Sequence, residues 1–160
     1  MKILKVFSVL SFVFLMSCSE ESITYHLNGV VKDSKEFNIS LPANSFKFDL
    51  KTSKDFEGYI NELVDIKDVK ISFEIDETKR GVLLNSTLLV DGFEIDLSES
   101  SLTPDGFISN KDFLAIITEK LLEKREISIR LLSNVDYSVE FSYVNIEMII
   151  HVDGVFEGGH

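Results

Sequence analysis

The chain has 160 residues, and its 27 acidic side chains outnumber 16 basic ones to give a net charge of −11. Such a surface repels the phosphates of nucleic acids and anionic lipid headgroups, which excludes nucleic acid as a partner. The length is ordinary for one domain, and the sequence contains no internal repeat or proline-rich linker. Because there is a single cysteine, the core has to be sufficient without disulfides.

The first 17 residues have the pattern of a secretory signal peptide. Lys2 and Lys5 give a basic start, and the apolar run Val6–Met16 that follows is interrupted only by two serines. A helix over this run rises about 16 Å, whereas the hydrocarbon core of a bilayer is roughly 30 Å thick. The run is therefore too short for a comfortable span and is typical of the apolar region of a signal peptide.

The apolar run ends in Leu15-Met16-Ser17-Cys18, which resembles the lipobox of bacterial lipoproteins. An aliphatic residue stands three places before the cysteine, and a small residue directly precedes it. The resemblance implies that Cys18 receives a diacylglycerol group, that cleavage occurs before it, and that the new amine is acylated. The alternatives are an ordinary secretory signal followed by a free cysteine, or a cytosolic protein with a buried first element.

This resemblance divides the chain into a signal peptide (1–17), a lipidated tether (18–22) and a single β-rich domain (23–160). One acyl chain binds a membrane only marginally, but two or three on Cys18 would hold the protein there persistently. Ser19 follows the cysteine, so the sequence does not resemble the aspartate-containing inner-membrane retention signal of enteric lipoproteins. We expect a lipid anchor in the outer membrane, with the domain either periplasmic or exposed at the cell surface.

The dominant period in the rest of the chain is two, which is typical of half-buried strands. Polar and apolar residues alternate in Phe37–Leu41, Phe46–Leu50, Val69–Asp76 and Ile127–Leu131. Pro42–Ser45 separates two of these runs and predicts a hairpin loop between them. Leu88–Leu97 predicts a second hairpin, because its Asp91-Gly92 pair favours a two-residue turn with positive φ at both positions.

The last strand pattern changes parity. Val139, Phe141 and Tyr143 occupy odd-numbered positions, whereas even-numbered positions are occupied by Val144, Ile146, Met148, Ile150 and Val152. One extra residue would bring both sets to the same face, so the pattern predicts a β-bulge or sharp bend between Tyr143 and Val144. The alternative is a long strand that is covered on both faces.

Two segments have helical spacing instead. The first comprises Phe56, Tyr59, Ile60, Leu63 and Val64, with Ser53 as a candidate cap. The second predicts a helix over 110–124, which begins at the capping-box-like Ser109–Asp112. Its apolar stripe consists of Phe113, Leu114, Ile117 and Leu121.

Together these patterns predict a mainly β fold of about seven or eight strands with one or two short amphipathic helices. Short connections favour antiparallel pairing, because parallel strands need longer crossovers. We expect a β-sandwich or a strongly curved sheet, with the second helix closing one side.

Residues that could carry chemistry are few. His26, His151 and His160 lack the spacing of a zinc site, although His26 and His151 lie in predicted strands and could meet across a sheet. Glu94 and Asp96 share a strand face beside Asp91; a solvated face and a polar loop explain these residues, and a bound calcium ion is the alternative. No nucleophile elbow or phosphate-binding loop is present, so we assign no catalytic residue, metal or cofactor.

Three hypotheses about function follow. The first is a non-catalytic binding or assembly module of the cell envelope with a protein partner, and it rests on architecture and anchoring. The second is a carrier that holds a lipid or other apolar ligand between the sheet and the helix over 110–124. The third is an enzyme, for which the sequence offers no constellation. A pocket of several hundred cubic ångströms under the helix would favour the carrier, and a filled core with an exposed apolar patch would favour the module.

Overall fold

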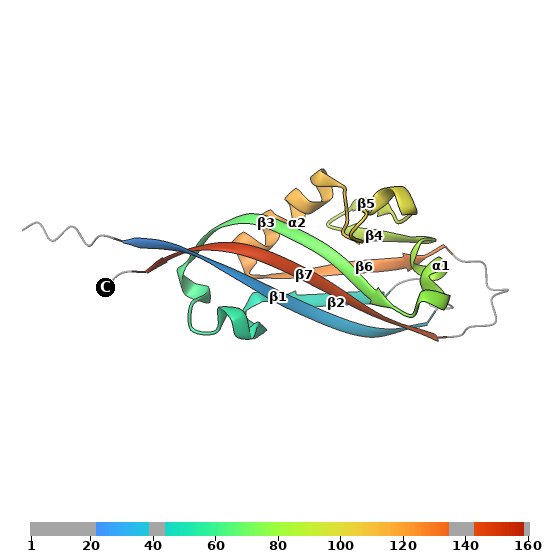
Figure 1. Cartoon of the computed structure of the whole chain (residues 1–160), viewed down its shortest axis with the longest axis horizontal. Helices are drawn as coiled ribbons and strands as arrows, with labels where there is room; N and C mark the ends of the chain where they lie inside the picture. The colour runs from blue at the N-terminus through green and yellow to red at the C-terminus, as the bar shows by residue number, and fades with distance from the viewer. Residues whose placement is uncertain (1–21, 39–43, 135–142, 159–160) are drawn as a thin grey trace, which may run out of the picture.

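Two antiparallel sheets form the two layers of the protein in the computed structural model, which describes residues 22–38, 44–134 and 143–158 (Figure 1). One sheet has the order β1-β7-β3 and the other β2-β6-β4-β5. The strands are β1 (Ile23–Asn38), β2 (Asn44–Asp49), β3 (Leu63–Ile75), β4 (Ser86–Val90), β5 (Phe93–Asp96), β6 (Glu126–Ser133) and β7 (Tyr143–Gly158). The predicted fold class, a mainly β sandwich-like arrangement, is confirmed.

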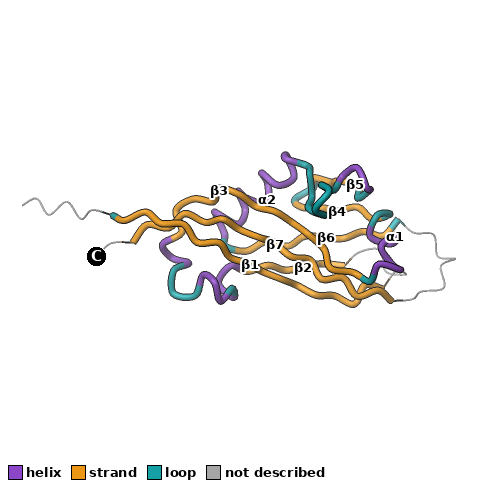
Figure 2. Tube along the Cα trace, in the orientation of Figure 1, coloured by secondary structure: helices purple, strands orange, loops and turns teal. Residues whose placement is uncertain are grey.

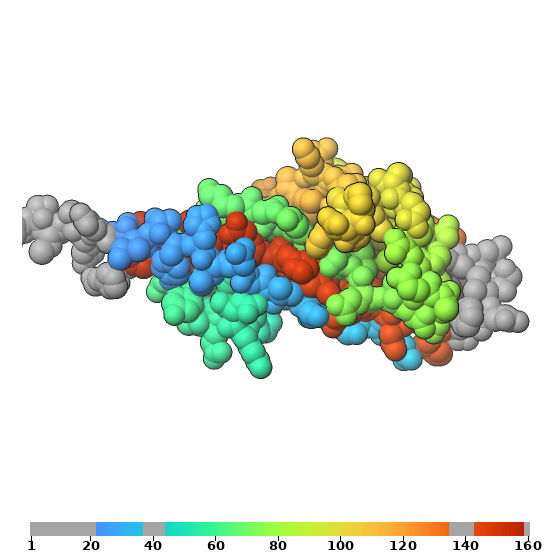
Figure 3. All heavy atoms as spheres, in the orientation of Figure 1, coloured from blue at the N-terminus to red at the C-terminus, as the bar shows by residue number. Residues whose placement is uncertain are grey.

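The three-stranded sheet is built around β7. Ile23 of β1 lies opposite Gly158, and Ile75 of β3 lies opposite Ile146, so both neighbours run antiparallel to the same strand. Alternate β7 residues face the core and are buried: Val144, Ile146, Met148, Ile150 and Val152. This is the parity that the sequence predicts for the strand. In Figure 3, β7 is visible between β1 and β3, so much of the face of this sheet that points away from the core is uncovered.

Helix α2 (Lys111–Lys124) closes one side of the sandwich by contacting β3 of one sheet and β6 and β5 of the other (Figure 2). Phe113, Ile117 and Leu121 are fully buried and Leu114 packs partly buried against the core, which confirms the predicted stripe. The helix begins one residue later than predicted, because Asn110 is the cap that accepts a hydrogen bond from the Phe113 N–H at 2.9 Å. The Ser109 hydroxyl instead donates to the Ser101 carbonyl at 2.9 Å.

The predicted helix around Phe56 is wrong. The segment forms three 3-10 turns, Leu50–Thr52, Lys54–Phe56 and Ile60–Glu62, before β3 begins at Leu63. Gly58 has φ +85°, a left-handed conformation that ends any helix there. Ser53 does act as a cap, since its hydroxyl oxygen accepts from the Asp55 N–H at 3.3 Å, but it caps a single turn.

The hairpin predicted around Pro42–Ser45 is also wrong. Its loop lies largely outside the described residues, but β1 pairs with β7 and β2 with β6, so the two runs belong to different sheets. The Asp91-Gly92 hairpin is confirmed, with φ values of 48° and 84° at its turn. The pairing of β1 with β7 is continuous across Tyr143 and Val144, so the predicted bulge is absent there; Val139 and Phe141 lie outside the described residues.

Candidate functional site

Both ends of the described chain lie at one end of the sandwich. Ile23 at the start of β1 lies opposite Gly158 at the end of β7. The first residues of β3 lie beside them, with Leu63 opposite Phe156 (Figure 1). We call this end the N-terminal pole and define it by Ile23, Tyr25, Tyr59 and Val64. Cys18, the predicted lipidation site, lies outside the described residues, but the chain that carries it enters the fold here.

A column of aromatic rings leads from the core to the surface of the N-terminal pole. The ring centroids of Phe56 and Phe156 are 5.6 Å apart, and both side chains are buried. Tyr25 stacks on Phe156 at 5.8 Å, and Tyr59 meets Tyr25 edge-on at 6.0 Å. The last ring of this column, Tyr59, is 47% exposed. Its exposed face is therefore supported from behind by packed rings.

Tyr25 also makes a polar contact at this pole. Its hydroxyl donates a hydrogen bond to the Glu62 carboxylate, and this bond raises the pKa of Tyr25 to about 12. A side chain at Gly158 would begin about a van der Waals distance, 3.4 Å, from the Tyr25 ring and 3.5 Å from the Glu62 carboxylate. Tyr25, Glu62 and the end of β7 therefore form one packed unit.

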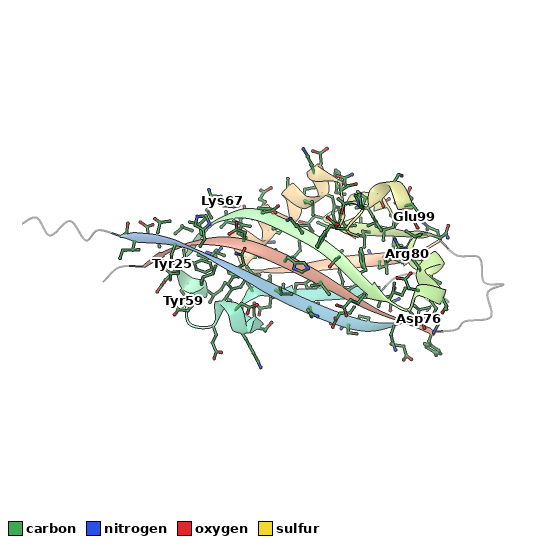
Figure 4. All side chains as sticks on the ribbon, viewed as in Figure 1. Tyr25, Tyr59, Lys67, Asp76, Arg80 and Glu99 are labelled. Atoms are coloured by element: carbon green, nitrogen blue, oxygen red, sulfur yellow. The ribbon has the colours of Figure 1, made fainter. Side chains whose placement is uncertain are left out.

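A cleft of about 260 Å³ lies at the opposite end of the molecule, between the end of β3, the short helix α1 (Arg80–Leu83) and the loop that contains Gly106. Figure 4 shows Asp76, Arg80 and Glu99 at this end and Tyr25 and Tyr59 at the other. We call the cleft between β3, α1 and the Gly106 loop the distal cleft. Its lining residues are Phe73, Glu74, Ile75, Glu77, Arg80, Leu83, Leu102 and Gly106.

The distal cleft combines half-buried apolar side chains with a charged rim. Arg80 lies 3.4 Å from the Glu99 carboxylate and 3.9 Å from that of Glu77, in loose and solvent-exposed ion pairs. Asp76 accepts hydrogen bonds from the hydroxyl and the N–H of Thr78, which lower the pKa of Asp76 and fix the turn before α1. This arrangement can hold an apolar group with a polar partner, but it offers no activated nucleophile.

A second hollow, of about 550 Å³, lies beside the C-terminal half of α2. It is lined mainly by charged and polar side chains from β2, β6 and the helix, among them Lys47, Lys120 and Glu126. Lys120 forms an ion pair with Asp91 at 2.6 Å, which raises the pKa of Lys120 and lowers that of Asp91. The hollow is therefore a polar groove at the side of the helix, and the apolar face of α2 is occupied by core packing.

The two histidines of the sheet do not meet. His26 lies opposite Val155 and approaches Asp153 at 3.3 Å, whereas His151 lies opposite Val30. His151 is 3.3 Å from the Ser72 hydroxyl, and desolvation, helped by nearby Lys70 and Lys32, lowers its pKa. Within the described part of the chain no carboxylate is hydrogen-bonded to His151, so the serine and histidine lack the third group of a triad. His160 lies outside the described residues.

The carboxylates of the β4–β5 hairpin do not converge on a cation. Asp91 pairs with Lys120, and Asp96 accepts a 2.6 Å hydrogen bond from the Thr87 hydroxyl, while Glu94 is exposed. Across residues 22–38, 44–134 and 143–158, no group of three or more histidine, cysteine or carboxylate side chains could hold a metal ion. In the same ranges, no helix is long and apolar enough to cross a bilayer.

No family model matches the chain, and no curated protein or solved structure is significantly similar to it. The candidate sites therefore rest on this chain alone. Sequence reasoning missed the aromatic column and the distal cleft. The column draws on Tyr25, Phe56, Tyr59 and Phe156, which come from three separate segments, so no local pattern in the sequence connects them.

Proposed function

We propose that the protein is a lipid-anchored, non-catalytic binding or assembly module of the bacterial cell envelope, held in the outer membrane by acyl chains on Cys18. The observation that carries this proposal is the basic start, short apolar run and Leu15-Met16-Ser17-Cys18 sequence, placed five residues before β1 begins at Ile23. A folded domain that starts so soon after the cysteine suits a protein displayed directly on a membrane.

The distal cleft is the best-supported contact for a protein partner. It lies at the opposite end from the N-terminal pole, so an anchor at Cys18 leaves it facing away from the lipid (Figure 4). Its half-buried Phe73, Ile75 and Leu102 beside Arg80 resemble the mixture of apolar surface and arginine found where proteins recognise each other. Arg80 is only loosely paired, and a partner's carboxylate could replace Glu77 or Glu99.

The filled core supports a module over a carrier. Phe113, Ile117 and Leu121, the side chains of α2 that a carrier would use to line its pocket, are fully buried in packing. The groove beside the helix is charged, whereas ligand pockets for apolar molecules are lined mainly by apolar side chains. Native mass spectrometry of the domain purified from cells separates the two functions, because a carrier would retain lipid in addition to the covalent anchor.

Metabolic labelling with a fatty-acid probe tests the anchor directly. The Cys18→Ala variant should lose all label because it lacks the acceptor sulfur. Ser17→Ala is the matched control, since it keeps a small residue before the cysteine and should be labelled like the parent. Undiminished label on Cys18→Ala would refute the assignment.

A further inference from the structure

We propose that the N-terminal pole of the domain inserts its exposed apolar side chains into the surface of the bilayer, so that the protein stands on the membrane on Ile23, Tyr59 and Val64. The occupant of this surface is the interface of a lipid bilayer. The inference rests on the proposed anchor at Cys18 and adds a second, non-covalent contact that fixes how the domain is oriented.

The distribution of exposed apolar side chains points to this end. Among the described residues, four large hydrophobic side chains are strongly exposed: Ile23 at 49%, Tyr59 at 47%, Val64 at 49% and Tyr143 at 53%. Single exposed hydrophobic residues are ordinary, but three of these four gather at one end. Tyr143 lies opposite Asn38, at the other end of the β1–β7 pair from Ile23 and Gly158.

The length of the tether brings this end to the membrane. From Cys18 to Ile23 the chain advances five residues, and a fully extended chain covers at most about 3.6 Å per residue, or roughly 18 Å. A domain held this closely has little freedom to turn its N-terminal pole away from the lipid. The covalent anchor already accounts for most of the entropy lost when the pole approaches the membrane surface. Contacts between the pole and the lipid that would be too weak by themselves can therefore form.

The chemistry of the pole suits the boundary between water and lipid. Tyrosine is enriched at membrane interfaces because its ring is apolar and its hydroxyl is polar. Tyr59 is backed edge-on by Tyr25, so its exposed ring is held outward by the aromatic column (Figure 4). Ile23 and Val64 come from β1 and the start of β3, which both flank the end of β7.

The charges around the pole favour an apolar contact over an electrostatic one. Glu62 contacts Tyr25 and Glu157 lies opposite Thr24, whereas Lys67 is already paired with Asp65. Excess negative charge is repelled by anionic headgroups. Zwitterionic phosphatidylcholine vesicles are accordingly the surface on which the contact is expected to form.

The absence of tryptophan from the chain allows a direct test. The mature chain from Cys18 is coupled through this cysteine to a maleimide lipid in phosphatidylcholine vesicles, with or without brominated acyl chains. The Tyr59→Trp protein reports on the N-terminal pole, and Tyr143→Trp is the matched control at the opposite end. We expect Tyr59→Trp emission to shift to the blue on coupling and to be quenched by brominated lipid, while Tyr143→Trp emission stays unchanged.

Adding Ile23→Ser and Val64→Ser to the Tyr59→Trp protein should abolish the shift and the quenching, and circular dichroism verifies that the sheet is retained. Equal quenching of the Tyr59→Trp and Tyr143→Trp proteins, or no quenching of either, would overturn the proposal. Chemical coupling does not depend on acylation in the cell. Failure of the anchor would appear in the Cys18→Ala labelling experiment, whereas failure of the pole contact would appear only here.

Discussion

Replacing Ile117 by alanine measures how tightly α2 is packed into the sandwich. Ile117 is fully buried in the middle of the helix stripe, between Phe113 and Leu121. The substitution removes three carbon atoms, and at about 0.8 kcal/mol for each buried methylene the transfer term alone is about 2.4 kcal/mol. The cavity that remains adds to this, so the free energy of unfolding should fall by roughly 2–5 kcal/mol. That is a large share of a typical stability of about 5–15 kcal/mol.

A denaturant melt of Ile117→Ala beside the parent checks this magnitude. Ile116→Ala is the matched control, because Ile116 lies one residue earlier in the same helix, is only partly buried, and gains the same helix propensity on replacement by alanine. Its cost should be clearly smaller. A loss below about 1 kcal/mol for Ile117→Ala, or equal losses for both variants, would mean that the helix lies over unfilled space. Together with altered lipid retention, that result would favour the carrier hypothesis.

Two further predictions concern the aromatic column that leads to the N-terminal pole. Ultraviolet titration should detect one of the four tyrosines, Tyr25, ionising near pH 12. Glu62→Gln should move the pKa of Tyr25 back toward 10, because the hydrogen bond to the Glu62 carboxylate is the main cause of the shift. Because the hydrogen bond favours the neutral phenol in the folded state, its contribution to stability is present below pH 10 and is lost as the pH rises through about 12. An unchanged titration of Tyr25 in Glu62→Gln would contradict the assigned cause of the pKa shift. Gly29→Ala places a Cβ 2.3 Å from the buried Phe56 ring and should cost about 1–3 kcal/mol in a denaturant melt. Gly81→Ala meets no atom within 4 Å and should cost nothing, so equal losses would refute the packing argument.

The sequence alone determined the elements whose signals are local. Alternation marked Val69–Asp76 and Ile127–Leu131 as strands because successive side chains point to opposite faces of a sheet. Asp91-Gly92 defined its turn because few other residue pairs accept positive φ at two successive positions. The stripe of α2 followed from the helical period, and in each of these cases neighbours in sequence are also neighbours in space.

Only the tertiary structure decided which strands pair and which surfaces form. Leu63 has helical spacing from Phe56 and Tyr59, but its pairing opposite Phe156 places it in a strand, because a long-range ladder stabilises it more than an isolated turn would. The runs on either side of Pro42–Ser45 resemble a hairpin, yet β1 pairs with β7 from the far end of the chain. The aromatic column and the distal cleft exist only after these pairings bring distant segments together, since each depends on contacts that no local pattern encodes.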